Sequence, residues 1–285
     1  MDRDDAVLPI VRITGAVIAI ALVIAVIILY GLPGQTDRHW SWTINPELTA
    51  MFMAAGYASG AYFFVRVLIG NSWRSVCLGF LPITAFTSFL LIATILHWGN
   101  FNHGHISFWL WIGLYAVTPF FVPFLWYLNR NRDPGHLPGE LELPAAVRGF
   151  TGAAGALLIT LALVMLISPS TVIDDWLWPL SELTARVIAA YIALTGGLLV
   201  NMAVDARWTA SKVMVETFMV GTVLMFIAII RDWGSLDPSQ AVRWGYLISV
   251  GVGLVLLLAL YSAMESRARR DTPAPVREEP AEPAG

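Results

Sequence analysis

Residues 11–32 read VRITGAVIAIALVIAVIILYGL, an apolar run interrupted by a single charge at Arg12. The hydrocarbon core of a bilayer is roughly 30 Å thick, and a helix rising about 1.5 Å per residue needs about 20 apolar residues to cross it. This stretch therefore predicts a transmembrane helix.

Seven further stretches have similar length and composition. The chain is 57% hydrophobic and only 13% charged, whereas soluble domains carry about 25% charged residues, so its apolar surface must face lipid. We predict an all-α integral membrane protein with about eight transmembrane helices, surrounded by the lipid bilayer and without a nucleic-acid partner. The predicted spans are 11–32, 47–69, 75–97, 106–128, 147–169, 182–204, 212–231 and 242–264.

Lysine and arginine residues are divided unequally between the two sides of the predicted bundle. Of the 17 Lys and Arg residues, only Arg38, Arg186, Arg231 and Arg243 fall on the side opposite the termini. Because positively charged loops remain in the cytoplasm, we expect a multi-pass protein of the cell membrane with both termini cytoplasmic. Residues 265–285 are rich in Pro, Glu, Ala and Arg, and they predict a disordered cytoplasmic tail.

The chain contains an internal repeat. Trp40-Ser-Trp42 and Glu47-Leu-Thr-Ala50 correspond to Trp176-Leu-Trp178 and Glu182-Leu-Thr-Ala185. This correspondence predicts two copies of a four-helix unit. Further Trp landmarks recur at the same separation along the chain as Glu47 and Glu182: Trp73 and Trp208, Trp98 and Trp233, Trp109 and Trp244. We call this constant separation the repeat offset.

Each predicted unit has an even number of spans, so both units enter the membrane from the same side. The halves are therefore expected to be parallel and related by a pseudo-twofold axis along the membrane normal. The predicted division is a first four-helix repeat at 1–135, a second at 136–264 and the tail at 265–285.

The repeated Trp residues gather on the non-cytoplasmic side. Indole rings at headgroup depth form aromatic belts in membrane proteins, and such a belt, or packing of the loops, is one interpretation. A ligand cleft is the alternative, because aromatic walls with a few polar groups are the usual composition of a binding site. The candidate ligand-binding residues of this kind are Trp42, Trp98, Trp178, Trp233, Asn100 and Asp232.

A carboxylate begins the second helix of each unit: Glu47 in the first unit and Glu182 in the second. A carboxylate in this place interacts favourably with the helix dipole, which is a purely structural role. Arg186 lies one turn after Glu182, a spacing that permits an ion pair, whereas the first unit has Met51 at that place. If the two helices meet near the pseudo-axis, Arg186 could serve both carboxylates, and the three residues form the leading candidate polar site.

Three of the five histidines, His97, His103 and His105, lie in one outer loop. A His-x-His pair can chelate a transition metal, and a third histidine could complete the site. A solvated polar loop is the competing interpretation, because the spacing fits no specific metal motif and Asp232 replaces His97 in the second unit. The sequence assigns no cofactor, and it contains no Walker A, Gly-x-Ser-x-Gly or His-Glu-x-x-His motif.

The segment Trp178-Pro-Leu-Ser-Glu-Leu-Thr-Ala-Arg186 resembles a Trp-x-x-x-Pro-Leu-Thr-Ala-Arg-like segment of uncharacterised bacterial multi-span membrane proteins. Those proteins have Pro where this chain has Glu182. The resemblance covers little more than this segment, and it implies no activity.

These features together predict a non-enzymatic membrane protein that binds or passes a small or lipidic ligand at its non-cytoplasmic face. The first alternative is a structural or assembly subunit of a membrane complex, which would use the same aromatic face to hold a membrane-protein partner. The second alternative is a membrane enzyme with a metal site in the loop from His97 to His105.

Overall fold

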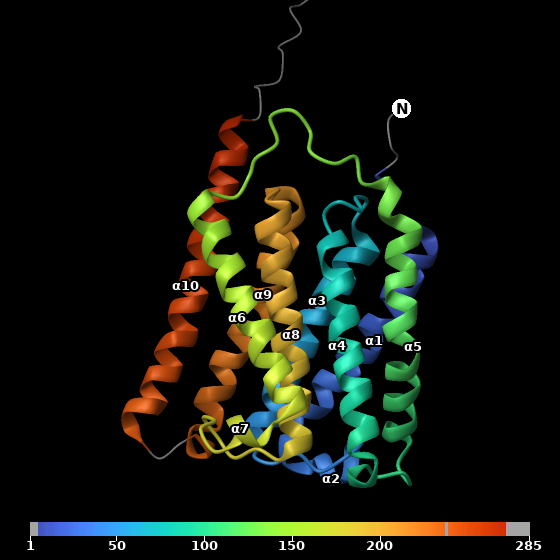
Figure 1. Cartoon of the computed structure of the whole chain (residues 1–285), viewed down its shortest axis with the longest axis vertical. Coiled ribbons are helices and arrows are strands. Elements are labelled where there is room, and N and C mark those ends of the chain that lie inside the picture. Colours follow the sequence, from blue (N-terminus) through green and yellow to red (C-terminus); the bar gives the residue numbers. More distant parts are fainter. Residues whose placement is uncertain (1–4, 237–238, 272–285) are drawn as a thin grey trace, which may run out of the picture.

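The computed structural model describes residues 5–236 and 239–271, and most of them lie in helices (Figure 1). Eight helices in the described part are long and apolar enough to cross a membrane, which confirms the predicted multi-pass architecture. Two short helices, α2 (Thr36–His39) and α7 (Ser170–Ile173), lie in connecting loops. The long helices are α1 (Pro9–Gly31), α3 (Glu47–Ile69), α4 (Cys77–Leu96), α5 (Ile106–Asn129), α6 (Ala145–Ile167), α8 (Glu182–Asp205), α9 (Trp208–Arg231) and α10 (Gln240–Asp271).

Local sequence explains where several helices begin and end. The Ser181 hydroxyl caps α8 by accepting the N–H of Thr184 at 3.2 Å. The ring of His105 caps α5 in the same way, because its Nδ1 accepts the N–H of Ser107 at 3.2 Å. Helix α8 ends at Asp205, and the next residue, Ala206, has a left-handed φ of 65° that turns the chain sharply into α9.

Helix α1 illustrates how side chains divide between protein and lipid. Gly15, Ala19 and Ala25 are buried on the side that packs against α3. Ile13 and Ile20 are 66% and 63% exposed. Such an apolar exposed face is unfavourable in water but is solvated by acyl chains in a bilayer.

The long helices stand in two rows of four (Figure 1). One row runs α1, α3, α9, α10 and the other α5, α4, α8, α6, and each helix packs against the next in its row. Within each half the first long helix therefore pairs with the second, and the third pairs with the fourth. The halves meet where the second helix of one packs against the third helix of the other. This is the pairing that a twofold relation between the halves would produce.

Small residues allow the closest contacts between helices. A Cβ atom added to Gly155 of α6 would come within 2.7 Å of the Gly196 carbonyl oxygen of α8. In α3, Gly56 lies against the ring of Tyr191, which leaves no room for a side chain there. Lipid tails are as apolar as the side chains, so helix association in membranes depends on such close packing and on polar contacts.

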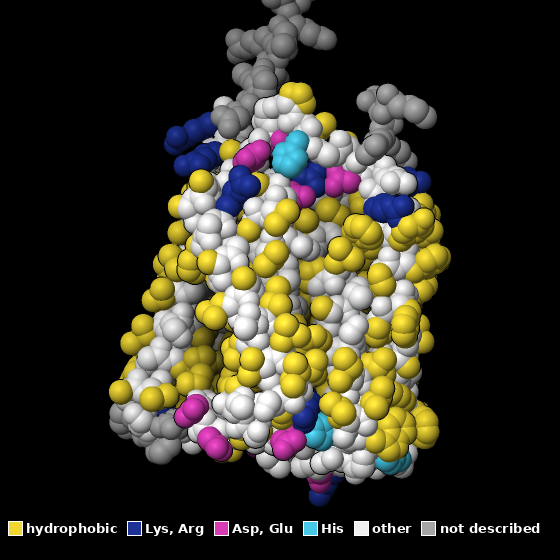
Figure 2. Space-filling view, viewed as in Figure 1, with side chains coloured by type: hydrophobic (Ala, Val, Ile, Leu, Met, Phe, Trp, Pro, Cys, Tyr) yellow, Lys and Arg dark blue, Asp and Glu magenta, His cyan; other side chains and the backbone are white. Residues whose placement is uncertain are grey.

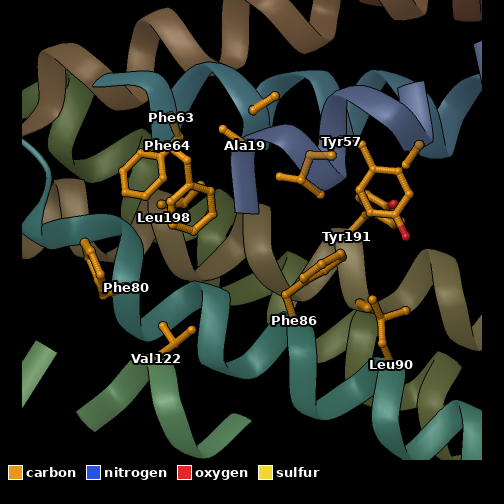
Figure 3. Close-up of a cluster of buried hydrophobic side chains, with 14 of the residues drawn as sticks. Ala19, Tyr57, Phe63, Phe64, Phe80, Phe86, Leu90, Val122, Tyr191 and Leu198 are labelled. Atoms are coloured by element: carbon orange, nitrogen blue, oxygen red, sulfur yellow. The ribbon is translucent and has the colours of Figure 1, made fainter. Parts of the chain in front are cut away.

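Aromatic rings from α3, α4, α5 and α8 pack together in the core (Figure 3). The rings of Phe86 and Tyr191 meet edge to face with centroids 4.9 Å apart. The hydroxyls of Tyr57 and Tyr115 share a hydrogen bond of 3.1 Å. The Tyr191 hydroxyl donates to the Met53 carbonyl at 3.2 Å, so each buried phenol has a polar partner.

Helix α1 begins and α10 ends at the same end of the bundle (Figure 1). Most of the Lys and Arg side chains visible in Figure 2 also lie there. We call it the arginine-rich end, and the opposite end, which carries α2 and α7, the arginine-poor end. Helix α10 continues to Asp271, so residues 265–271 of the predicted disordered tail are helical, and residues 272–285 lie outside the described part.

Helix α10 is the least embedded of the spans. Only 6% of its membrane-spanning residues are buried, and its main packing partner is α9. It is inclined relative to the other helices and separates from α6 toward the arginine-poor end (Figure 1).

The cytoplasmic location of the arginine-rich end remains a prediction. In a Cys77→Ser background, which removes the single cysteine, cysteines introduced at His103 or Asp175 should react with a membrane-impermeant maleimide in intact cells. A cysteine at Asn131, at the arginine-rich end, should react only after the membrane is permeabilised. The reverse labelling pattern would invert the orientation.

Candidate functional site

The predicted polar cluster around Arg186 is present in part, at the arginine-poor end. Arg186 forms an ion pair with Glu182 at 3.1 Å, and its guanidinium nitrogen lies 2.7 Å from His97 Nε2. Its Nε donates to the Leu166 carbonyl at 2.9 Å. The arginine side chain is only 12% exposed, so these three partners take the place of water.

Glu47 lies apart from this cluster. Its carboxylate lies against Gly34, and the ion pair of Arg186 found among the described residues is with Glu182. The expected sharing of Arg186 between two carboxylates is therefore not seen. The two side chains have different neighbours, because Arg186 contacts His97 after α4 and Leu166 of α6, whereas Glu47 lies beside Gly34 after α1.

Asp232 takes the capping position at the start of α3. Its carboxylate accepts the Leu48 N–H at 2.7 Å and the Ser235 hydroxyl at 2.6 Å. A carboxylate here is stabilised by free N–H groups and by the helix dipole. His97 occupies the corresponding place after α4 and contacts α8. In each half, the residue that follows the third long helix therefore contacts the second long helix of the other half.

The candidate Trp residues of the double-Trp motifs lie in two different clusters. Trp178 is buried and donates its indole N–H to the Thr49 hydroxyl at 2.8 Å, which ties the second-half loop to α3. Trp42 is buried in the first half, with its ring centroid 5.2 Å from that of Phe101 and 4.9 Å from that of Trp111. Among the described residues, these two indoles belong to separate hydrophobic clusters.

The remaining aromatic candidates are closer to the surface. Trp98 is 45% exposed and packs against the His103 ring, with 5.2 Å between centroids. Trp233 packs against Trp244, also at 5.2 Å. Asn100 is exposed in the same loop as Trp98. Trp98 and Trp233 thus pack against neighbouring rings near the surface of the bundle, and Asn100 is exposed beside Trp98.

The three loop histidines turn to different partners. His97 meets Arg186, the His103 ring lies 4.6 Å from that of Phe108, and His105 caps α5. Over residues 5–236 and 239–271, no group of three or more His, Cys, Asp or Glu side chains could hold a metal ion. The metal-site alternative gains no support from this arrangement.

An open cavity of about 450 Å³ adjoins Trp178 at the arginine-poor end. Asp174, Trp176 and Ser235 contribute to its walls. The indole nitrogen of Trp176 is buried and has no hydrogen-bond partner within the described chain.

A second, apolar space of about 340 Å³ lies between α3, α8, α9 and α10. We call it the α10 groove. Gly221 and Gly253 leave it open, and Phe52, Met225 and Val250 form apolar walls. Figure 2 shows a hollow with a hydrophobic floor beside α10, on the side that would face lipid. In the sequence, only glycines such as Gly221 and Gly253 indicate that a space could remain here.

A polar network joins α3, α9 and α10. It was not predicted from the sequence. Arg66 forms an ion pair with Glu216. The Glu216 carboxylate also accepts the hydroxyls of Tyr62 at 2.7 Å and Tyr261 at 3.1 Å. The available signal was a pair of opposite charges inside two different spans, with Arg66 about one turn and Glu216 about two turns from the helix ends at the arginine-rich end.

Another ionic cluster lies at the arginine-rich end. Arg207 is 3% exposed and binds Asp133 and Asp205, with two 2.7 Å contacts to each carboxylate. Burial acts to raise the pKa of Asp133, but hydrogen bonds from Arg207 and the Gly135 N–H lower it overall. An open cavity of about 270 Å³, which we call the Cys77 cavity, adjoins both carboxylates.

Replacement of Trp178 by Phe should lower the free energy of unfolding by about 1 kcal/mol, because the buried indole donor to Thr49 is lost. Trp42→Phe is the matched control, since its indole nitrogen has no hydrogen-bond partner within the described chain, and it should cost less. Thermal unfolding of both variants in the same detergent compares them. Equal losses would show that ring volume, and not the hydrogen bond, determines the effect.

The pKa of His97 is lowered by burial and by the neighbouring Arg186, while Glu182 acts in the opposite direction. The folded protein therefore favours neutral His97, and this contribution to stability is lost as the pH falls below about 6.5, where the unfolded histidine protonates. His97→Gln should reduce the loss of thermal stability between about pH 7 and pH 5. An unchanged pH dependence of the melting temperature would contradict this role.

No family model, no curated protein and no solved structure matches this chain. Its cavities and polar groups are therefore the evidence for its function.

Proposed function

We propose that this multi-pass membrane protein binds an amphipathic lipid whose acyl chain occupies the α10 groove. The groove extends from the arginine-poor side to the middle of the membrane region, since it runs from Phe52 near the start of α3 to Ser59 further along it. Ligand binding at that side is the function expected from the sequence, and the groove adds the chemistry of the ligand.

The lining of the groove favours an alkyl chain over a polar solute. Phe52, Met225 and Val250 present apolar surface. The hydroxyls of Ser59 and Thr195 donate to carbonyls of their own helices, at 3.1 Å and 2.9 Å. Because a polar ligand would lose its hydration and find few free partners, its entry would be unfavourable.

The corresponding space in the first half is filled by protein, and this observation carries the proposal. The repeat offset aligns Gly221 with Phe86 and Val250 with Tyr115. Phe86 and Tyr115 line a cavity of about 60 Å³, compared with about 340 Å³ for the α10 groove. The smaller residues of the second half therefore support a space kept open for a ligand.

A duplication of a four-helix unit is part of this proposal. The Trp landmarks suggest it from the sequence, and two further observations support it. The same helix pairs occur in both halves. His97 and Asp232, which the repeat offset makes equivalent, form reciprocal contacts with the opposite half.

The polar end of the lipid would lie in the cavity beside Trp178. The Trp178 ring is 6.1 Å from that of Phe52, so this cavity and the groove adjoin the same aromatic pair. The unpartnered indole N–H of Trp176 is a donor suited to a headgroup oxygen, whereas the Ser235 hydroxyl already donates to Asp232.

Gly253→Phe should close the groove. A Cβ added at Gly253 meets no atom within 4 Å, so the ring can enter the groove without displacing the backbone. Gly245→Phe is the control, because it lies on the same helix, is equally unobstructed and does not line the groove. Cross-linking of a phospholipid with a photoreactive acyl chain, mapped to the Phe52 and Met225 peptides, should fall about tenfold in Gly253→Phe only, which corresponds to ~1.4 kcal/mol.

Equal cross-linking in wild type and Gly253→Phe would refute the lipid-binding proposal. The alternative of a structural or assembly subunit predicts a separate observation. In that case, a membrane protein would co-purify in stoichiometric amount with wild type and with Gly245→Phe, and it would be lost from Gly253→Phe.

A further inference from the structure

We infer that the Cys77 cavity binds the ammonium group of a zwitterionic aminophospholipid headgroup. The cavity lies between the ends of α4, α5 and α8 at the arginine-rich end of the bundle, where headgroups of the bilayer would surround it. It shares no lining residue with the α10 groove. It therefore represents a second site, separate from the function proposed above.

The carboxylates at the cavity outnumber the buried arginine that pairs with them. Asp133 and Asp205 both line the cavity, and both bind the single guanidinium of Arg207. The lining also holds the guanidinium of Arg130, so the cavity presents both signs of charge, as a zwitterionic headgroup does. The Cys77 sulfur lies 3.9 Å from an Asp133 oxygen, so a group that reaches the thiol also reaches the carboxylate. A cation is favoured in such a place because interactions between charges are strong in low-dielectric surroundings.

Two indole rings supply the remaining recognition of a cation. Trp73 and Trp126 both line the cavity. An ammonium group near the face of an indole ring is attracted by the ring quadrupole, and the attraction increases when the site is partly desolvated. Carboxylate and aromatic walls together are the chemistry that recognises an organic ammonium.

The second half contains its own ammonium at the corresponding place. The repeat offset aligns Cys77 with Lys212 and Trp126 with Tyr261. The Lys212 ammonium lies 5.5 Å from the centre of the Tyr261 ring and 2.9 Å from the Glu265 carboxylate. Where the second half places an ammonium beside an aromatic ring, the first half has a short thiol and an open cavity. The repeat offset aligns Glu265 with Arg130, so the carboxylates of the first half at this place are instead Asp133 and Asp205. An external ammonium group would lie between these carboxylates and the Trp126 ring.

The rim of the cavity explains why a phospholipid is the expected source of the ammonium. Arg130 lines the cavity beside the carboxylates, and its guanidinium lies 3.6 Å from the centre of the Tyr127 ring. A guanidinium here suits the phosphate of a headgroup. Leu81 and Val204, which also line the cavity, are 44% and 76% exposed and would continue as an apolar path for the chains.

Cys77 is the single cysteine of the chain and therefore reports on the cavity directly. In nanodiscs of phosphatidylglycerol, the rates of modification by cationic aminoethyl and anionic sulfonatoethyl methanethiosulfonate are compared. The reference is a cysteine at Leu137, exposed in the loop at the same end, in a Cys77→Ser background. The cation-to-anion ratio at Cys77 should exceed that at position 137 by about tenfold, equivalent to ~1.4 kcal/mol. An equal or smaller ratio would overturn the inference, because Arg130 alone would attract the anion.

Lipid composition tests the identity of the ligand. Phosphatidylethanolamine in the nanodiscs should slow the modification of Cys77 at least about fivefold, equivalent to ~1 kcal/mol. Soluble phosphoethanolamine added to phosphatidylglycerol nanodiscs should protect much less, because it lacks the apolar path along Leu81. Protection by the soluble compound alone would overturn the assignment to a lipid, and absence of any protection would overturn the site.

Two variants complete the test. Cys77→Lys should introduce the ammonium that Lys212 supplies in the second half, and it should reduce the phosphatidylethanolamine retained in native mass spectrometry, whereas Cys77→Ser should retain it. Equal retention by both variants would contradict the inference. Gly253→Phe should leave the protection of Cys77 unchanged, so that failure of this site and failure of the α10 groove can be distinguished.

Discussion

The hydrocarbon region of a bilayer has no water to satisfy a polar group, so every polar group placed there must find its partner within the protein. This constraint explains how neighbouring helices are joined. Arg66 and Glu216 connect α3 to α9, and the Tyr261 hydroxyl adds α10 to the same carboxylate. Because lipid tails compete equally for apolar side chains, these polar contacts and the close approach at Gly155 determine which helices are neighbours.

The same helix pairs occur in both halves, but side chains of different size fill the spaces between the helices. At the arginine-rich end, the second half places Lys212 and Glu265 where the first half leaves the Cys77 cavity. Toward the arginine-poor end the difference is reversed, since the first half is filled by Phe86 and Tyr115 and the second half contains the α10 groove. In the proposed duplication, side-chain size thus decides where space remains, while helix order stays the same.

The membrane spans could be predicted from the sequence because length and hydropathy alone determine whether a helix can cross a bilayer. The pair of Glu182 and Arg186 followed from helical spacing, and the structure contains it. Contacts between distant helices could not be predicted in this way. The sharing of Arg186 with Glu47 failed because helix neighbours depend on packing that periodicity does not encode, and the cap on α3 instead comes from Asp232. The start of the predicted disordered tail at residue 265 was also misplaced, because a charged segment can continue a helix beyond the membrane as α10 does.

The length and inclination of α10 connect the protein to the thickness of its membrane. Its 32 residues span about 48 Å at 1.5 Å per residue, so its charged last turns extend beyond a hydrocarbon core of roughly 30 Å. A helix whose apolar stretch is longer than the hydrocarbon core tilts to shorten its projection. Since α10 is joined to α9 by polar contacts near one end and diverges from α6 at the other, a change in tilt alters mainly the arginine-poor opening of the groove. A thin membrane would widen this entrance and a thick one would narrow it, so lipid composition would act on the protein mechanically as well as chemically.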